Sequence, residues 1–359
     1  MKKSIYKSGI ILIAAICFLP AGLQAQEASK EFHKEYVAGP GTTLSLSNKY
    51  GNVTIQSWDQ DQVVIDVKVT VEMPDQERAQ KLLDYIDVQF TEGGDLISAE
   101  TVIDEKFNFS GWGNRSRRFS IVYKVKMPVD ANLNLSNRYG NSDIDVLNGL
   151  VDLNVKYGDL AVGKLSRQNE KPMSAINIAY GRVTVDEAGW LDIYSRYSPS
   201  MRIEKSRALL LDSKYSKIQI GETSSLVGES RYDNIRIENI NNLIFESGYD
   251  DINIGRLSKK LEFKGSYGSF SADEVPAGFE ALRIETRYTG VQLGIDENAS
   301  YKLDARVSYG GLKIDEDKFK YQKRIIGNTS NETSGIVGNE ENPASEVNIQ
   351  ASYGSVKLY

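Results

Sequence analysis

Short alternations of apolar and polar residues recur along the chain on both sides of a tyrosine. Before the tyrosine, apolar residues stand six and four positions earlier, as Leu209 and Leu211 do before Tyr215. After it, they stand three and five positions later, as Ile218 and Ile220 do. Alternation with period two is typical of a strand with one buried face. Each tyrosine therefore marks a unit of strand, bend, strand and loop.

This tyrosine position occurs twelve times among the 20 tyrosines of the chain. Between Tyr197 and Tyr267 the steps are 18, 17, 17 and 18 residues. The unit appears first at Tyr50 and last at Tyr353. The positions between them are Tyr139, Tyr157, Tyr180, Tyr197, Tyr215, Tyr232, Tyr249, Tyr267, Tyr288 and Tyr309. Such regular self-similarity indicates a repeat architecture.

A repeat of 17 to 23 residues with two short strands is too small to enclose a core by itself. Similar units stacked in register can do so, because each strand pairs with strands of the coils above and below it at about 4.8 Å. We therefore predict an all-β fold, a parallel β-solenoid of about a dozen short coils. We expect it to be a right-handed β-helix with a small N-terminal α+β cap.

Parity predicts which side chains face the interior. The tyrosine has the parity of the apolar pair before it, so we expect its ring to point inward and the rings to form an aromatic ladder. The position two residues before the tyrosine has the same parity, and a polar column there can hydrogen-bond to the turn backbone. Small polar residues often occupy it: Asn48, Asn137, Ser195, Ser213, Ser230, Ser247 and Thr286.

The bends and one irregular unit follow from local sequence. Gly-Asn and Gly-Asp dipeptides directly after several tyrosines favour a sharp bend. After Tyr197, however, the apolar pair is Met201 and Ile203, displaced by one residue, with Pro199 in the bend. This displacement predicts a bulge or a widened turn in that unit.

The two ends of the chain depart from the repeat. Residues 41–130 form the predicted cap, with a helix after Pro74 that places Ala79, Leu82, Leu83 and Ile86 on one face. The solenoid repeats span residues 131–314. Residues 315–343 are polar and rich in Gly and Asn, which predicts an excursion loop, and residues 344–359 form the final coil.

The N-terminus predicts export. Residues 1–25 begin with lysines, continue with an apolar run and end in Leu-Gln-Ala, as a secretory signal peptide does. A lipoprotein with acylated Cys17 is the alternative, but the bulky Ile16 before it argues against that processing. Residues 26–40 form a polar N-terminal tail. We expect the mature protein in the periplasm or at the cell surface of a Gram-negative bacterium.

Composition narrows the possible chemistry. Without Cys17 the mature chain has no cysteine, so disulfides, thiolate metal sites and cysteine nucleophiles are excluded. His33 is the single histidine and lies in the polar tail, so neither a Ser-His-Asp triad nor a multi-histidine metal site can form. The sequence indicates no catalytic residue, no metal site and no cofactor.

The charge balance argues against two kinds of partner. The chain has 43 Lys and Arg residues against 49 Asp and Glu residues. A nucleic-acid binder needs a basic surface, so nucleic acid is not an expected partner. We also expect no transmembrane segment in the mature chain. Envelope glycans or another surface protein remain as candidate partners.

Several phrases resemble a known family. The stretches "LSNKYGNVTIQSW", "VKMPVDANLNLSNRYGNSDIDVLNG" and "ASYGSVKLY", with the repeated Tyr-Gly-x-φ-x-φ pattern, resemble the bacterial putative-adhesin domains of unknown function. Those domains are related to the auto-transporter adhesin head (GIN) domains, which form β-helices. The resemblance covers nearly all of the mature chain. It implies the β-helix fold and brings no catalytic residue.

The position directly before the tyrosine is often basic and outward by parity. We call these residues the basic column: Lys49, Arg138, Lys156, Arg196, Lys214, Arg231 and Arg287. Lys156, Arg196, Lys214, Arg231 and Arg287 are the candidate surface-binding stripe for an anionic glycan or lipopolysaccharide. An acidic column lies two residues earlier: Asp212, Glu229, Glu246 and Glu285. We expect the two columns to neutralise each other largely.

Two classes of function remain, with self-association as a further possibility. We expect a non-catalytic, adhesin-like envelope protein that offers its repetitive surface for binding or scaffolding. The alternative is a β-helix polysaccharide lyase or glycoside hydrolase, because Asp233, Asp250 and Asp251 stand in successive bends at the spacing a hydrolase needs. Bends also select Asp for turn chemistry. Self-association would use a solenoid face or the last strand.

Overall fold

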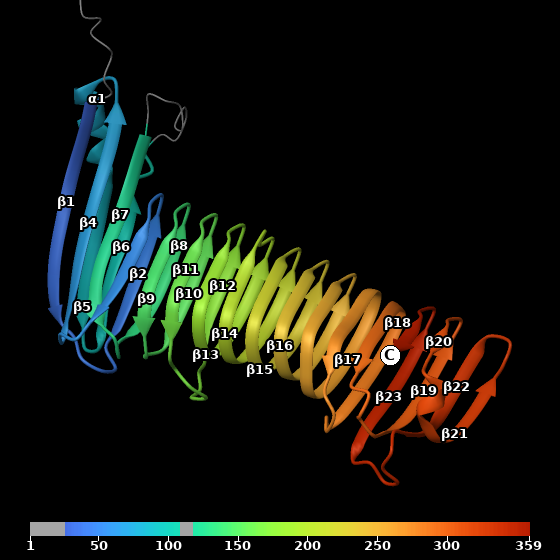
Figure 1. The fold of residues 1–359 in the computed structure, drawn as a ribbon. Coiled ribbons are helices and arrows are strands. Elements are labelled where there is room, and N and C mark those ends of the chain that lie inside the picture. The colour runs from blue at the N-terminus through green and yellow to red at the C-terminus, as the bar shows by residue number, and fades with distance from the viewer. Residues whose placement is uncertain (1–25, 108–117) are drawn as a thin grey trace, which may run out of the picture.

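The computed structural model of the protein describes residues 26–107 and 118–359. They form one elongated, open stack of strands with long strands at the N-terminal end and a hairpin at the other end (Figure 1). The predicted signal peptide lies outside the described residues. The architecture is all-β, and its parallel pairing is that of stacked solenoid units.

The described residues of the N-terminal cap, 26–107 and 118–128, form seven strands and one helix. The helix α1 (Gln76–Leu83) begins after Asp75, whose side chain accepts a hydrogen bond from the Arg78 N–H. Ala79 and Leu83 are buried and Leu82 is half-buried, as predicted. Ile86, predicted on the same helix face, lies beyond the helix and begins the next strand. The strands are β1 (Gln26–Val37), β2 (Thr43–Lys49), β3 (Val53–Trp58), β4 (Gln62–Met73), β5 (Ile86–Gly93), β6 (Leu96–Ile103) and β7 (Arg118–Pro128).

The prediction of a polar tail over residues 26–40 is wrong, because most of it is the strand β1. This strand pairs antiparallel with β4 along its whole length. Phe32 and Tyr36 pack against the core, but charged residues stand between them and hide the period-two signal. His33 is not a free linker residue: its Nδ1 lies 2.6 Å from Asp66 Oδ1. That contact and Glu35 raise the pKa of His33 above its ordinary value.

The repeats form two faces that meet at the tyrosine bends. The strand segments before the tyrosines make the pre-tyrosine face, and the segments after them make the post-tyrosine face. The strands are β8 (Asn132–Arg138), β9 (Ser142–Leu147), β10 (Val151–Lys156), β11 (Leu160–Leu165), β12 (Ser174–Ala179), β13 (Val183–Arg196), β14 (Met201–Lys214), β15 (Lys217–Arg231), β16 (Asn234–Gly248), β17 (Asp251–Val275), β18 (Ala281–Ile295), β19 (Tyr301–Ser308) and β20 (Leu312–Lys313).

The repeats stack in parallel register, so equivalent apolar residues form buried columns. Leu209 pairs with Leu226, which pairs with Leu243, and all three are buried. In the irregular unit, Val183 and Met201 pair directly although they follow their tyrosines by three and four residues. The extra residue is therefore accommodated in a widened turn, without a bulge in the strand.

The C-terminal region differs from the predicted loop and final coil. Residues 315–343 contain the 3₁₀ helix η1 (Glu316–Lys318) and a hairpin of β21 (Phe319–Ile326) and β22 (Ser330–Val337) that pairs with β19. The last strands are β23 (Ser345–Ser352) and β24 (Val356–Leu358). Strand β23 lies between β18 and β19, parallel to both. The final coil is thus inserted into the stack and does not end it.

Candidate binding groove

The tyrosine rings lie outside the core, so the prediction that they point inward is wrong. The ladder tyrosines from Tyr139 onward are 39 to 59% exposed. Every one of the twelve has a positive φ, between 52° and 63°. A residue in this left-handed conformation interrupts the alternation of the strand. The basic column and the tyrosines that follow it can therefore both face solvent.

The rings stack into one continuous tyrosine ladder along the bends. Neighbouring ring centroids are 4.7 to 5.1 Å apart and the rings are tilted by at most 16°. Tyr353 stacks between Tyr288 and Tyr309, which follows the insertion of the final coil. At the N-terminal end, Phe119 packs on Tyr50. The ladder therefore presents a ridge of ring edges and hydroxyl groups.

The polar column two residues before the tyrosines is buried as predicted except at Ser247, which is half-buried. Its two asparagines hydrogen-bond to the bends. Asn48 and Asn137 are 2% and 1% exposed. The Nδ2 group of each donates a hydrogen bond of 3.0 Å to the carbonyl of the glycine three residues later. Each amide thus satisfies a backbone group at the bend that water reaches poorly.

The three bend aspartates serve mainly as hydrogen-bond acceptors. Asp250 is buried and accepts from the Asp233 N–H at 2.7 Å and from the Gly248 N–H at 2.9 Å. Asp233 is also buried and accepts from the Ser216 N–H at 2.7 Å. Burial raises the pKa of Asp233 to about 6. Asp251 is exposed and accepts from the Ser269 hydroxyl at 2.6 Å.

The basic column lies beside the ladder and is less neutralised than predicted. Among the described residues of the candidate stripe, Arg196 alone forms an ion pair with the acidic column, to Asp212 at 2.9 Å. Lys156 lies over the ring of Tyr157. Arg287 lies over the ring of the tyrosine that follows it. Lys214 and Arg231 have no ion pair within the part of the chain that the structure describes.

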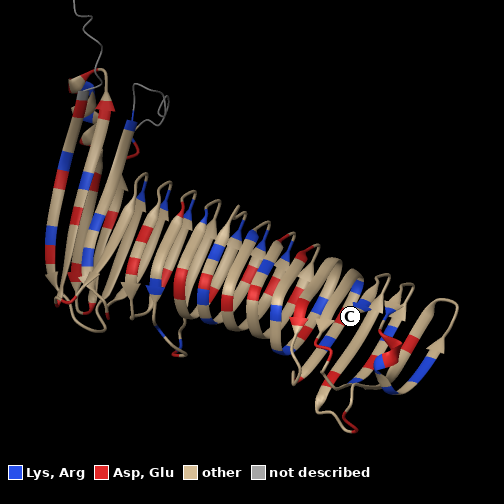
Figure 2. Cartoon of the chain, in the orientation of Figure 1, with Lys and Arg blue, Asp and Glu red and all other residues tan. Residues whose placement is uncertain are grey.

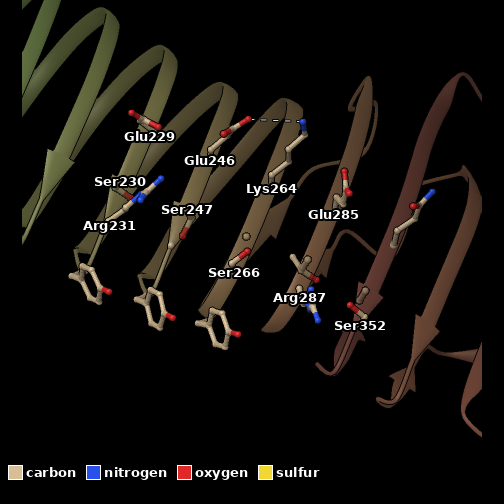
Figure 3. Close-up of a pocket in the computed structure, with 18 of the residues that line it drawn as sticks. Glu229, Ser230, Arg231, Glu246, Ser247, Lys264, Ser266, Glu285, Arg287 and Ser352 are labelled. Carbon is tan, nitrogen blue, oxygen red and sulfur yellow. Dashed lines mark ion pairs between the residues drawn. The ribbon is translucent and has the colours of Figure 1, made fainter.

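A groove of about 820 Å³ opens on the pre-tyrosine face across β15 to β19 and β23. Its floor exists because the basic column is interrupted. Arg231 pairs in register with Gly248, Gly248 with Ser266, and Ser266 with Arg287. Two small residues therefore separate two arginines by three strand spacings, on the order of 14 Å. Figure 3 shows Ser266 between Arg231 and Arg287.

The walls of the groove differ in character. Tyr232, Tyr249 and Tyr267 form the wall at the ladder. The opposite wall carries the charged residues that stand three positions before the tyrosines. Among them, Glu246 and Lys264 form an ion pair of 3.9 Å (Figure 3). Glu229, Glu285 and Arg306 also line the groove. The site combines aromatic edges, hydroxyl groups, cations and carboxylates, and neither sign of charge fills it alone.

Sequence reasoning missed the groove although its signal is present. The stripe residues Arg231 and Arg287 line it, whereas Lys156, Arg196 and Lys214 lie on coils outside it. Two consecutive gaps in the basic column, at residues 248 and 266, mark its position, whereas the single gap at Ala179 lies outside the groove. Elsewhere, basic (blue) and acidic (red) segments are interspersed along the stacked strands (Figure 2).

Within residues 26–107 and 118–359, no helix has the length and apolar character needed to cross a membrane.

The fold and groove define an all-β repeat protein with an open polar groove on one face. No family model matches the chain, and no curated protein matches it. A solved structure described as a putative adhesin from Parabacteroides distasonis is 10% identical, with 92% of this chain and 97% of that chain covered and a TM-score of 0.29.

Two further solved structures show the same low level of similarity. A putative adhesin from Parabacteroides merdae is 9% identical over 92% of this chain and 96% of that chain, with a TM-score of 0.29. A structure described as a putative lipid binding protein from Parabacteroides distasonis is 10% identical, with the same coverages and a TM-score of 0.25. Scores this low carry no argument about the function of this chain.

Proposed function

We propose that the protein is a non-catalytic, exported envelope or surface protein of adhesin-like type whose groove binds a glycan. The observation that supports this proposal is the interruption of the basic column at Gly248 and Ser266 between Arg231 and Arg287. A site for a chain-like ligand needs an elongated floor with polar groups along it. The groove has both, and it crosses several strands at right angles to their direction.

The lining matches the chemistry of a sugar chain better than that of an apolar ligand. Sugar hydroxyls donate to carboxylates such as Glu229 and Glu285 and accept from guanidinium groups. Arg231 and Arg287 can also form charge-assisted, bidentate hydrogen bonds with uronate or sulfate groups. A nucleic acid would need a net basic groove, and the three glutamates that line this one counteract its cations.

The proposed location rests on the sequence. Residues 1–25 have the pattern of a secretory signal peptide. The resemblance to putative-adhesin domains, and through them to GIN domains, supports an adhesin-like role at the envelope. A right-handed solenoid of about a dozen coils is part of this proposal.

A glycan array with the mature chain tests the binding proposal. We expect retention of acidic oligosaccharides, and an affinity at least tenfold lower for the variant Arg231→Ala/Arg287→Ala. The matched control is Lys156→Ala, which removes a cation from the same column outside the groove and should bind as the wild type does. Equal binding by all three proteins, or no binding to any glycan, would refute the proposal.

An enzyme that acts on glycans is the second candidate. Glu229 and Glu246 pair in register on adjacent strands, which brings two carboxylates into the same groove. Glycoside hydrolases use two carboxyl groups roughly 5 to 10 Å apart. Lyase and hydrolase assays on the glycans that bind distinguish the candidates. Turnover that is lost in Glu229→Gln and Glu246→Gln would establish the enzyme.

A further inference from the structure

The pre-tyrosine face ends in a free strand edge at each end of the molecule. Among the described residues, β5 pairs with β6 alone at the N-terminal end. At the other end, within the part of the chain that the structure describes, β21 pairs with β22 alone. An unpaired edge presents N–H and C=O groups that can pair with another strand. Both edge strands are eight residues long.

The residues of the two edge strands themselves carry opposite charge. Strand β5 contains Asp87 and Glu92 and no basic residue. Strand β21 contains Lys320, Lys323 and Arg324 and no acidic residue. Pairing two copies of the same edge would bring like charges together, which is unfavourable across strands. Pairing β21 with β5 brings opposite charges together.

Local ion pairs engage part of these charges and leave others free. Lys320 lies 3.4 Å from Glu341, and Arg324 is paired with Glu316. Asp87 lies 3.8 Å from Lys30. Lys323 and Glu92 have no ion pair within the described part of the chain, and both are exposed. These two residues are the best probes of the contact.

The β21 edge also exposes apolar side chains. Tyr321 is 66%, Ile325 51% and Ile326 67% exposed. Covering such surface is favourable by roughly 25 cal/mol per Å² of apolar area. An edge strand with three large exposed apolar residues is a site where a further strand would be stabilised.

We propose that copies of the protein associate head to tail, with β21 of one copy adding to β5 of the next. The pre-tyrosine face then continues from one molecule into the other. Because the two edges differ, the contact is heterologous and can repeat, so it builds an open filament. The groove lies between the two edges and stays accessible in the assembly.

The first test uses the mature chain and zero-length carbodiimide cross-linking with mass spectrometry. We expect cross-linked peptides that join Lys320 or Lys323 to Asp87 or Glu92. Fifteen strand spacings separate β5 from β21 within one molecule, on the order of 70 Å, so such a cross-link must be intermolecular. Sedimentation should show a mass that rises with concentration and falls at high salt, because ions screen exposed charges.

Charge reversal gives the decisive comparison. Lys323→Glu and Glu92→Lys should each lower the association constant at least tenfold, and the double variant should restore it because the charges are exchanged. Thermal unfolding of each variant verifies that the fold is kept. A protein that stays monomeric at every concentration, a single reversal without effect, or cross-links between other surfaces would each overturn the proposal.

Discussion

The tyrosine at each bend holds a strained backbone and gains from its neighbours. A left-handed conformation costs a residue with a β-carbon roughly 1 to 2 kcal/mol. A stacked aromatic pair contributes roughly 0.5 to 1.5 kcal/mol beyond its buried area. Tyr215 stacks on both Tyr197 and Tyr232, so two such contacts offset the strain at this bend.

Tyr215 is therefore a direct probe of the ladder. We expect Tyr215→Ala to lower the free energy of unfolding by about 1 to 3 kcal/mol, because both stacks are lost while the strain stays. Tyr215→Phe keeps the ring and should remain within about 0.5 kcal/mol of the wild type. Urea titration measures both values. An alanine variant as stable as the phenylalanine variant would show that stacking does not stabilise the bend.

Asp233 makes stability depend on pH in the direction opposite to that of a salt-bridged carboxylate. Burial raises its folded-state pKa from 3.8 to about 6. A raised pKa means that the folded state binds the proton more tightly, so this contribution is present below about pH 4 and is lost as the pH rises through 6. The loss is about 1 to 3 kcal/mol for a shift of roughly two units.

The variant Asp233→Asn isolates this effect, since it keeps an acceptor for the Ser216 N–H and cannot ionise. We expect its stability relative to the wild type to improve by about 1 to 3 kcal/mol between pH 4 and pH 7. Urea titrations at several pH values measure this difference. A difference that does not change with pH would contradict the assigned cause.

The position of the tyrosine rings could not be predicted from the sequence pattern, whereas the strands and bends could. The period-two patterns located the strands, the bends and the buried polar column, since all of them depend on side chains that alternate. The rings were placed on the wrong side because one left-handed residue reverses parity, and the sequence pattern records no φ angle. Glycine or asparagine would have signalled that conformation, whereas tyrosine does not.

At the scale of elements, the final coil of the sequence is inserted between two earlier coils of the stack. Strand β23 contributes pairing to both β18 and β19, and Tyr353 stacks on Tyr288 and Tyr309. Nothing in the local sequence gives this order, because an inserted coil and a terminal coil have the same alternation. The hairpin of β21 and β22 was missed for a related reason: β21 is mostly exposed, β22 is mostly half-buried, and neither shows an apolar period of two.

Deletion of residues 344–359 tests the inserted position. It leaves β18 and β19 without the strand between them. The backbone amides of β19 to β22 should therefore exchange faster in a hydrogen–deuterium exchange experiment. Deletion of residues 297–359 is the control, because it ends the stack at β18 and should keep protection in β13 to β17. Retained protection in β19 after the shorter deletion would contradict the inserted arrangement.

At the scale of the whole molecule, the groove is a property of stacking and not of any single motif. The floor consists of four residues, Arg231, Gly248, Ser266 and Arg287, whose strands lie side by side in register. The first and the last of them are more than fifty positions apart in the sequence. The same column is filled by basic side chains on most other coils. The groove therefore lies where two consecutive coils lack the basic residue of the repeat.

Completing the repeat should weaken binding at least tenfold while the fold is kept. In Gly248→Arg/Ser266→Arg, both positions receive the residue type that the column carries at Arg231 and Arg287. A β-carbon at residue 248 would lie 3.5 Å from the nearest atom, an Arg231 side-chain carbon, so the backbone accepts it. Ala179→Arg makes the same change in this column outside the groove.

The most direct measurement is the affinity of these proteins for the oligosaccharide that the array selects, determined by isothermal titration calorimetry. We predict that Gly248→Arg/Ser266→Arg binds at least tenfold more weakly than the wild type, with an unchanged melting temperature, and that Ala179→Arg binds normally. Undiminished binding by the filled groove would show that the ligand lies elsewhere and would contradict the account.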